Sequence, residues 1–477
     1  MERVVLVVSL SISIIFFIDN FSDIYAQHNQ QPLSKENITL FDPTLKIELV
    51  TSGLDFPTTM AFLGPDDFLI LEKNTGYVKR VTNGILHEKP LLHVNTNLKD
   101  ERGLLGIAIS KKKLSDYPFF VENKKLTHNV FLYYIECNKK GLACENRIYK
   151  YDLDNENNEL INPRLLVGIP SFPDPSHIGG IIRIGLDENL YFTVGNFQNT
   201  IPTKIYKTIT QNFEDGEDID GRAGILRMTQ YGSPVLDANG NGLLGNEFPL
   251  NMYFAYGIRN SFGIDFDPVT GKLWDTENGP QFGDEINLVE PGFNSGADRV
   301  YGIWESNEIG DMLKNKTGAP IVVGNDPQNL VNFDQKGKYS PPEFIWIKTI
   351  APTGISFLNS DKLGSQYKND MFVGSADGGY LFHFKLNDAR NGFILNGNLT
   401  DKIAYNRTDF ADEILFAEGF SIITDVKEGP DGYLYIVSGL KQSKTEKFGA
   451  VFRIVPLTID NSTKDNTNNK IHTTENE

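Results

Sequence analysis

One pattern recurs along the chain: an apolar stretch, a tight turn, and a second apolar stretch. It occupies residues 60–71, 182–193, 264–274 and 426–436, and its turns contain Asp together with Pro, Gly or Asn. Turns of this composition join antiparallel strands, and the short period of the flanking apolar residues is that of strands. The pattern therefore predicts a chain built largely from antiparallel hairpins.

Three copies of the pattern are followed by a further strand-like stretch, at residues 76–81, 224–228 and 449–454. Repeated four-stranded antiparallel units are typical of a β-propeller. The 477 residues would otherwise allow about three domains, and a series of β-sandwiches is the alternative. That alternative is disfavoured because no linker rich in Pro or Ser divides the chain. About 430 ordered residues at ~40–70 per blade allow six to eight blades.

The two ends of the chain differ in composition from the part between them. Residues 4–18 form an uncharged apolar run after Arg3, and the small residue Ala26 follows. Residues 1–26 are therefore predicted to be a signal peptide of a secreted or periplasm-like protein, with an uncleaved anchor as the alternative. We expect a lead-in at 27–48, in which residues 37–43 add a strand that closes the ring. The propeller should span residues 49–457, and the polar stretch 458–477 should be a disordered tail.

The two cysteines, Cys137 and Cys144, lie at the adjoining ends of two strand-like stretches. A disulfide across this hairpin suits an exported protein, and two unpaired thiols are the alternative.

The charge of the chain limits the partners that it can bind. The sequence has 62 acidic and 45 basic side chains, which give a net charge of -17. This balance argues against duplex nucleic acid as the main partner and favours small neutral ligands or cations. Motifs for a nucleotide-binding P-loop, a serine hydrolase and a zinc hydrolase are all missing from the sequence.

Three segments carry side chains suited to chemistry. His177 stands before two glycines at the start of one repeat, where an imidazole can approach a ligand and act as a base. Arg259 and Asn260 lie between glycines and offer several hydrogen-bond donors. Residues 277–287 combine carboxylates, Asn and free carbonyls, the oxygen ligands that hard cations require. Each segment could instead be a polar loop that satisfies its own backbone.

Taken together, the segments resemble the soluble, calcium- and pyrroloquinoline-quinone (PQQ)-dependent sugar dehydrogenases, which include aldose, glucose and sorbosone dehydrogenases. The resemblance extends over roughly residues 49–456 and rests on five runs, at 101–108, 176–180, 185–191, 257–263 and 277–287. It implies an all-β fold, a six-bladed β-propeller of four-stranded antiparallel blades. It also implies an exported oxidoreductase that oxidises the C1 hydroxyl of an aldose to a lactone and passes electrons to an external acceptor.

The resemblance assigns roles to individual residues. His177 matches the base that removes the hydroxyl proton, and Glu101 matches a polar residue beside the substrate or cofactor. Arg259 and Asn260 match residues that contact the quinone. The remaining matches concern metal: the carbonyls of Gly279 and Pro280 hold the cofactor's calcium, and Glu285 binds a second, structural calcium.

Four positions depart from the family. Asn196 replaces an Asp that orients His177, and it can hold the imidazole but cannot stabilise its charged form. Asp377, Ile422 and Thr424 stand where the family has one Lys and two Arg that face the anionic cofactor.

Lys427 and Lys441 are candidates to restore the lost positive charge. The departures leave a second interpretation open, in which the chain is a cofactor-less propeller of the same family that binds a carbohydrate or a protein.

Overall fold

The computed structural model describes residues 38–116, 125–138, 143–171, 176–197, 207–280, 282–302, 329–439 and 449–457. The expected signal peptide and tail lie outside these residues. Within them the protein is all-β, with a single α-helix, α3 (Arg407–Phe410). No helix in the described ranges is long and apolar enough to cross a membrane.

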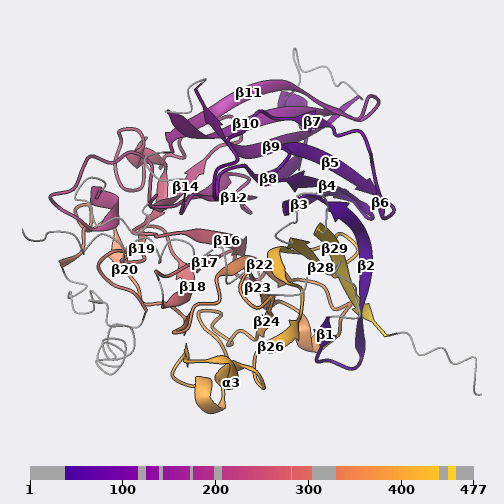
Figure 1. Ribbon diagram of the computed structural model, residues 1–477. Coiled ribbons are helices and arrows are strands. Elements are labelled where there is room, and N and C mark those ends of the chain that lie inside the picture. The colour runs from indigo at the N-terminus through magenta and orange to yellow at the C-terminus, as the bar shows by residue number, and fades with distance from the viewer. Residues whose placement is uncertain are drawn as a thin grey trace, which may run out of the picture.

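The described strands form six sheets, which follow one another around a common centre (Figure 1). The first sheet contains β3 (Pro57–Gly64), β4 (Asp67–Glu72), β5 (Tyr77–Thr82), β6 (Ile85–Leu86) and β7 (Leu92–His93). The second contains β8 (Leu104–Lys111), β9 (Leu126–Cys137), β10 (Cys144–Asp154) and β11 (Glu159–Pro170). The third contains β12 (Gly179–Ile184), β13 (Leu190–Val194), β14 (Gly224–Met228), β15 (Tyr253–Tyr256), β19 (Phe293–Asn294) and β20 (Lys338–Tyr339).

The fourth sheet contains β16 (Ser261–Phe266), β17 (Leu273–Glu277), β18 (Asp284–Val289), β21 (Phe344–Trp346) and β25 (Ile403–Ala404). The fifth contains β22 (Pro352–Leu358), β23 (Asp370–Ser375), β24 (Leu381–Phe384), β26 (Leu415–Glu418) and β1 (Thr39–Leu40). The sixth contains β27 (Ile422–Glu428), β28 (Leu434–Gly439), β29 (Gly449–Pro456) and β2 (Leu45–Leu54). Every sheet contains a run of four antiparallel strands, but four sheets carry additional short strands at an edge, of which the sequence predicted only β1. The all-β propeller is thus present, with sheets of four to six strands.

The core is divided among the contacts between neighbouring sheets. Six clusters of buried apolar side chains each combine residues from two adjacent sheets, and the last cluster joins the final sheet to the first. The innermost strands also contact one another in a closed circuit, in the order β3, β8, β12, β16, β22, β27 and back to β3. The sheets are therefore held together by apolar burial between their faces.

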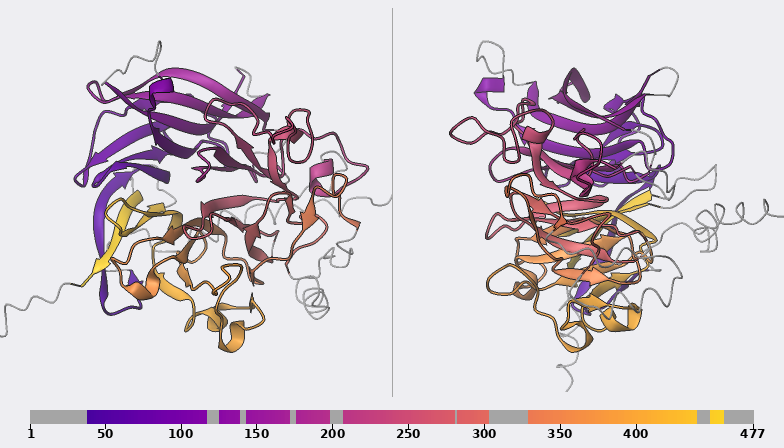
Figure 2. Two further views of the ribbon diagram at one scale, coloured as in Figure 1. Left: turned by 180° about the vertical axis from the view of Figure 1, so that it is seen from behind. Right: turned by 90° about the vertical axis from the view of Figure 1, so that its left-hand side faces the viewer.

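The ring is closed by β2, which pairs with β29 along most of its length. In Figure 1 the indigo β2 runs beside the yellow β29, and the view from behind in Figure 2 shows the same contact. The closing strand begins at Leu45, before the expected propeller boundary at residue 49. The expected lead-in strand at 37–43 is β1, and it pairs with β26 in the neighbouring sheet and does not join the closing sheet.

The disulfide predicted between Cys137 and Cys144 is confirmed. The two residues face each other where β9 pairs with β10, with their Cα atoms 4.0 Å apart.

Candidate active site

The functional candidates gather at one end of the ring because of the strand order. The innermost strand of each sheet starts at this end, and the second strand, which is antiparallel to it, finishes there. His177 precedes β12, Asn196 follows β13, and Arg259 and Asn260 directly precede β16. Residues far apart in the sequence therefore converge on one site.

The backbone beside His177 requires glycine. His177 has a left-handed φ of 54°, and its carbonyl oxygen lies so close to Gly195 that a Cβ atom there would be 2.0 Å away. Any side chain at position 195 would therefore displace the loop that carries the imidazole.

The imidazole is hydrogen-bonded at both ring nitrogens. Nδ1 lies 3.0 Å from Oδ1 of Asn196, and Nε2 lies 2.8 Å from Nη2 of Arg259. A guanidinium can only donate, so Nε2 must accept, and the proton of the neutral ring is assigned to Nδ1. Burial and the charge of Arg259 lower the pKa of His177 to about 3. The site thus holds a neutral imidazole with its lone pair at Nε2.

Arg259 is held by the neighbouring strand. Its backbone N–H donates to Oε1 of Glu277 at 2.6 Å, and its Nη1 donates to the carbonyl of Asn278 at 2.7 Å. The second carboxylate oxygen of Glu277 accepts from Ser295 at 2.6 Å. Glu277 lay in the acidic segment singled out in the sequence, but its role in holding Arg259 depends on strand pairing that the sequence did not reveal.

Asn260 and Glu101 hold the loop that carries His177. Oδ1 of Asn260 accepts from the N–H of Gly179 at 3.1 Å, and Oε2 of Glu101 accepts from the N–H of Ile178 at 3.2 Å. Burial raises the pKa of Glu101, while these hydrogen bonds and Arg259 oppose the shift. Both residues lie where a cofactor contact was predicted, and both have a positioning role in the protein itself.

The sequence did not single out Asp298, which lies beyond Asn196. Nδ2 of Asn196 donates to Oδ2 of Asp298 at 3.4 Å, and the hydroxyl of Tyr301 donates to the other oxygen at 2.9 Å. Asn196 is 1% exposed, so its hydrogen bonds with His177 and Asp298 determine how its amide is oriented. No spacing in the sequence connects position 298 with His177, because the loops that follow β13 and β19 are far apart in the chain and meet only in the folded sheet.

The predicted metal ligands lie in two places. Gly279 and Pro280 follow β17 at the same end as His177, and the N–H of Gly279 donates to Asp284 at 2.9 Å. Glu285 is buried on β18, opposite Glu277 of β17, and burial raises its pKa to about 8. Among the described residues, no group of three or more His, Cys, Asp or Glu is arranged to hold a metal ion. The metal roles therefore remain predictions.

Lys427 does not carry a free positive charge. Its ammonium is buried in the central channel, 3.7 Å from Oδ2 of Asp425, and Nη2 of Arg183 lies 3.3 Å from the other oxygen. Burial and the charge of Arg183 lower the pKa of Lys427 to about 8. Lys441, the other candidate, lies outside the described residues. The sequence was therefore wrong to treat Lys427 as an available cation: Asp425, two residues earlier on β27, shares its face of the strand, and Arg183 joins the pair only in the fold.

Lys73 is a better placed cation, which the sequence did not single out. It follows β4 at the active end of the ring, and its ammonium lies 5.9 Å from the centre of the Phe56 ring. Phe56 directly precedes β3, whose start lies at the same end of the ring. Burial lowers the pKa of Lys73, while Glu101 and Asp100 oppose the shift.

Asp377, which replaces a family lysine, follows β23 and is exposed. Its backbone N–H donates to the carbonyl of Ile350 at 3.0 Å. Solvent screens its charge, so this position is less unfavourable to an anionic ligand than the sequence suggested.

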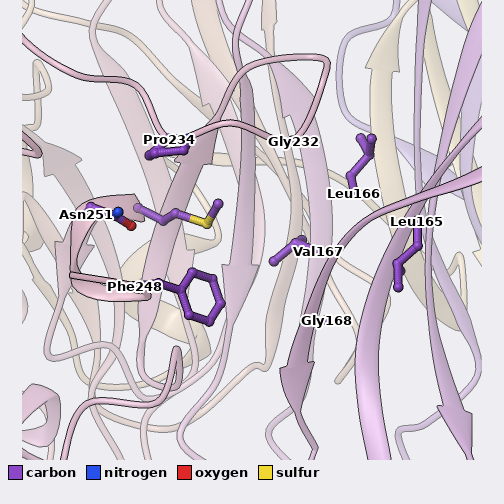
Figure 3. A pocket seen from close by; sticks show the side chains of 9 residues that line it. Leu165, Leu166, Val167, Gly168, Gly232, Pro234, Phe248 and Asn251 are labelled. Carbon is purple, nitrogen blue, oxygen red and sulfur yellow. The ribbon is translucent and has the colours of Figure 1, made fainter. Parts of the chain in front are cut away.

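A surface hollow of about 440 Å³ lies between β11 and the segment 232–252, away from His177. Figure 3 shows its lining, in which Leu165, Val167 and Phe248 are apolar and Asn251 supplies the polar group. It has no titratable side chain, so the hydrogen-bonded cluster around His177 is the better candidate for chemistry.

The chain is similar to known proteins over most of its length. Residues 54–447 match the family model described as glucose/sorbosone dehydrogenase. An aldose sugar dehydrogenase of Escherichia coli is 24% identical, with 87% of this chain and 93% of that protein covered. A quinoprotein glucose dehydrogenase B of Acinetobacter calcoaceticus is 26% identical, with 80% of this chain and 89% of that protein covered.

Solved structures agree in fold. A putative oxidoreductase (glucose dehydrogenase) of Thermus thermophilus has a TM-score of 0.60 and 25% identity, with 86% of this chain and all of that chain covered. The PQQ-bound form of an aldose sugar dehydrogenase of Streptomyces coelicolor has a TM-score of 0.58 and 22% identity, with 88% and 97% covered. With the family match extending over most of the propeller, the chain belongs to the glucose/sorbosone dehydrogenase family, a family of PQQ-dependent sugar dehydrogenases.

Proposed function

We propose that this protein is an exported, PQQ- and calcium-dependent dehydrogenase that oxidises the C1 hydroxyl of an aldose to a lactone. One observation carries the proposal: His177 is held neutral, with the lone pair of Nε2 beside the guanidinium of Arg259. A neutral imidazole can take the proton of a hydroxyl, and a fixed guanidinium can stabilise negative charge that develops beside it. The two groups needed for proton removal thus stand together.

The residues around His177 fit the cofactor in part. Arg259 and Asn260 offer hydrogen bonds, and the carbonyls of Gly279 and Pro280 are oxygen ligands of the kind that calcium takes. Lys73, which follows β4 at the same end of the ring, is the cation that would meet one carboxylate of the cofactor. The bound quinone and its calcium would supply the acceptor for the hydride that leaves C1.

In this reaction the protein's own groups handle the proton. The substrate hydroxyl would take the place of Arg259 at Nε2 of His177, and Nε2 would accept its proton. Asn196 would keep the other proton of the ring on Nδ1 through its Oδ1. The guanidinium would then be free to face the oxygens of the bound quinone. Because Asn196 is neutral, the imidazolium gains less stabilisation than from an aspartate.

We also propose that each of the six sheets is one blade. The closed circuit of the six innermost strands and the six clusters between sheets support this. The Cys137–Cys144 disulfide supports an oxidising compartment outside the cytoplasm. The partners would be a small aldose and an external electron acceptor.

A second function is favoured by a specific observation. Ile422 and Thr424 leave the start of β27 without the two cations expected for an anionic cofactor. The alternative is therefore a propeller that binds a carbohydrate or a protein without PQQ.

Reconstitution separates the two functions. The purified protein is titrated with PQQ in the presence of calcium, and dye-linked oxidation of aldoses is measured. The enzyme requires binding at micromolar PQQ and turnover that is lost in His177→Ala but retained in the exposed control His93→Ala. No binding at micromolar PQQ would leave the binding function, and unchanged turnover of His177→Ala would refute the assignment of the base.

A further inference from the structure

We propose that Asp298 is a positioning residue for His177, acting through Asn196. The resemblance to the family predicted a carboxylate directly beside the imidazole. In this chain the carboxylate is that of Asp298, and the amide of Asn196 lies between it and the imidazole. The inference rests on the proposed function in one respect, that His177 acts as the base.

The hydrogen bonds have a fixed direction along this chain of side chains. An amide has one accepting oxygen and one donating NH₂ group. The carboxylate of Asp298 can accept only the NH₂ group of Asn196, at 3.4 Å, and this turns Oδ1 of Asn196 toward Nδ1 of His177, at 3.0 Å. Nδ1 must then donate, which leaves Nε2 to accept. Asp298 thereby favours, from the Nδ1 side of the ring, the same tautomer that Arg259 favours at Nε2.

Asp298 is itself firmly held. Its backbone has a left-handed φ of 66°, its N–H donates to the hydroxyl oxygen of Tyr301 at 3.0 Å, and that hydroxyl donates back to Oδ1 at 2.9 Å. The charged groups that act on it are Arg259 and Lys207, which both favour the carboxylate and oppose the effect of burial, which raises its pKa. An ionised Asp298 is the stronger partner for the amide.

The same geometry explains why position 196 is not an aspartate in this chain. A carboxylate at 196 would lie where the amide NH₂ now faces Asp298, about 3.4 Å away. Two carboxylates at this distance in a buried site cannot both be ionised at low cost. Asn196 and Asp298 therefore form an exchangeable pair, in which one position carries the charge and the other the amide.

The test uses imidazole nitrogen NMR of the full chain labelled with ¹⁵N-histidine, with His177 assigned from its loss in His177→Gln. This measurement needs neither cofactor nor substrate. Wild type should show neutral His177 protonated at Nδ1 at pH 7. In Asp298→Ala the ratio of the Nδ1–H to the Nε2–H tautomer should fall by about tenfold, as expected for one hydrogen bond. An unchanged ratio would overturn the proposal.

The swapped pair provides the matched control. Asn196→Asp alone should perturb the site because two carboxylates face each other, whereas the double variant Asn196→Asp/Asp298→Asn should restore the Nδ1–H tautomer. A double variant that is no closer to wild type than Asn196→Asp would also refute the pairing.

Activity then distinguishes this inference from the proposed function. If the reconstituted protein is a dehydrogenase, Asp298→Ala should lower kcat by about tenfold with little change in KM, and the double variant should recover it. If wild type binds no PQQ, the proposed function fails while the NMR result still decides whether Asp298 sets the tautomer. If wild type is active but Asp298→Ala retains both the tautomer and kcat, only this inference fails.

Discussion

Acidification should destabilise the protein through His177, and the structure determines the size of the effect. In the unfolded chain the imidazole has its ordinary pKa of 6.5, whereas burial and Arg259 lower the folded pKa to about 3. Between pH 6.5 and pH 3 the imidazole of His177 is therefore protonated in the unfolded chain but neutral in the folded protein. The stabilising contribution of neutral His177 is complete above pH 6.5 and is lost as the pH falls toward 3. At about 1.36 kcal/mol per pH unit, the loss between pH 7 and pH 5 is about 2 kcal/mol.

The assay is urea unfolding of wild type and His177→Gln at pH 7, 6 and 5. Many carboxylates titrate in the same range, but they are common to both proteins and cancel in the difference between the two free energies of unfolding. Wild type should lose about 2 kcal/mol more than His177→Gln between pH 7 and pH 5. The exposed variant His93→Gln controls for the loss of an imidazole elsewhere. If the wild-type and His177→Gln curves stay parallel over this range, the fold does not hold His177 neutral.

Three further outcomes follow from the structure. If Glu285 helps to bind a structural calcium, chelation should lower the free energy of unfolding of wild type by about 2.7 kcal/mol relative to a calcium concentration 100 times its Kd, and the thermal midpoint should fall with it. Differential scanning calorimetry of Glu285→Gln should detect no such shift. Lys73→Met should weaken PQQ binding by about tenfold in a fluorescence titration, as expected for a lost charge-assisted contact. The control is Lys111→Met, which should bind like wild type because Lys111 is the last residue of β8 and so lies at the opposite end of the ring from Lys73. Replacing both Cys137 and Cys144 with Ser should lower the free energy of unfolding by about 2.5 kcal/mol, the value for a short closed loop. A reducing agent should then affect wild type and leave the double variant unchanged.

Much of the fold could be predicted from local sequence. The hairpin turns, the all-β class and the Cys137–Cys144 pairing all depend on residues close together in the chain, and the structure agrees with each. The extra edge strands were missed because strands of two or three residues leave no recognisable period. The closing strand was expected at 37–43 but is β2, because the strand that pairs with β29 could not be identified when its partner lies at the other end of the chain.

The sequence alone determined which residue types stand at the start of the inner strands. His177, Arg259 and Asn260 were singled out from the sequence, and the strand order brings them together because antiparallel neighbours place these loops on one side.

Only the tertiary structure decided which partner each of these groups has. It pairs Asp425 with Arg183, joins Arg259 to His177, and sets Asp298 behind Asn196. These contacts join residues far apart in the sequence, and the charge and proton position of a buried group depend on neighbours that no local pattern records.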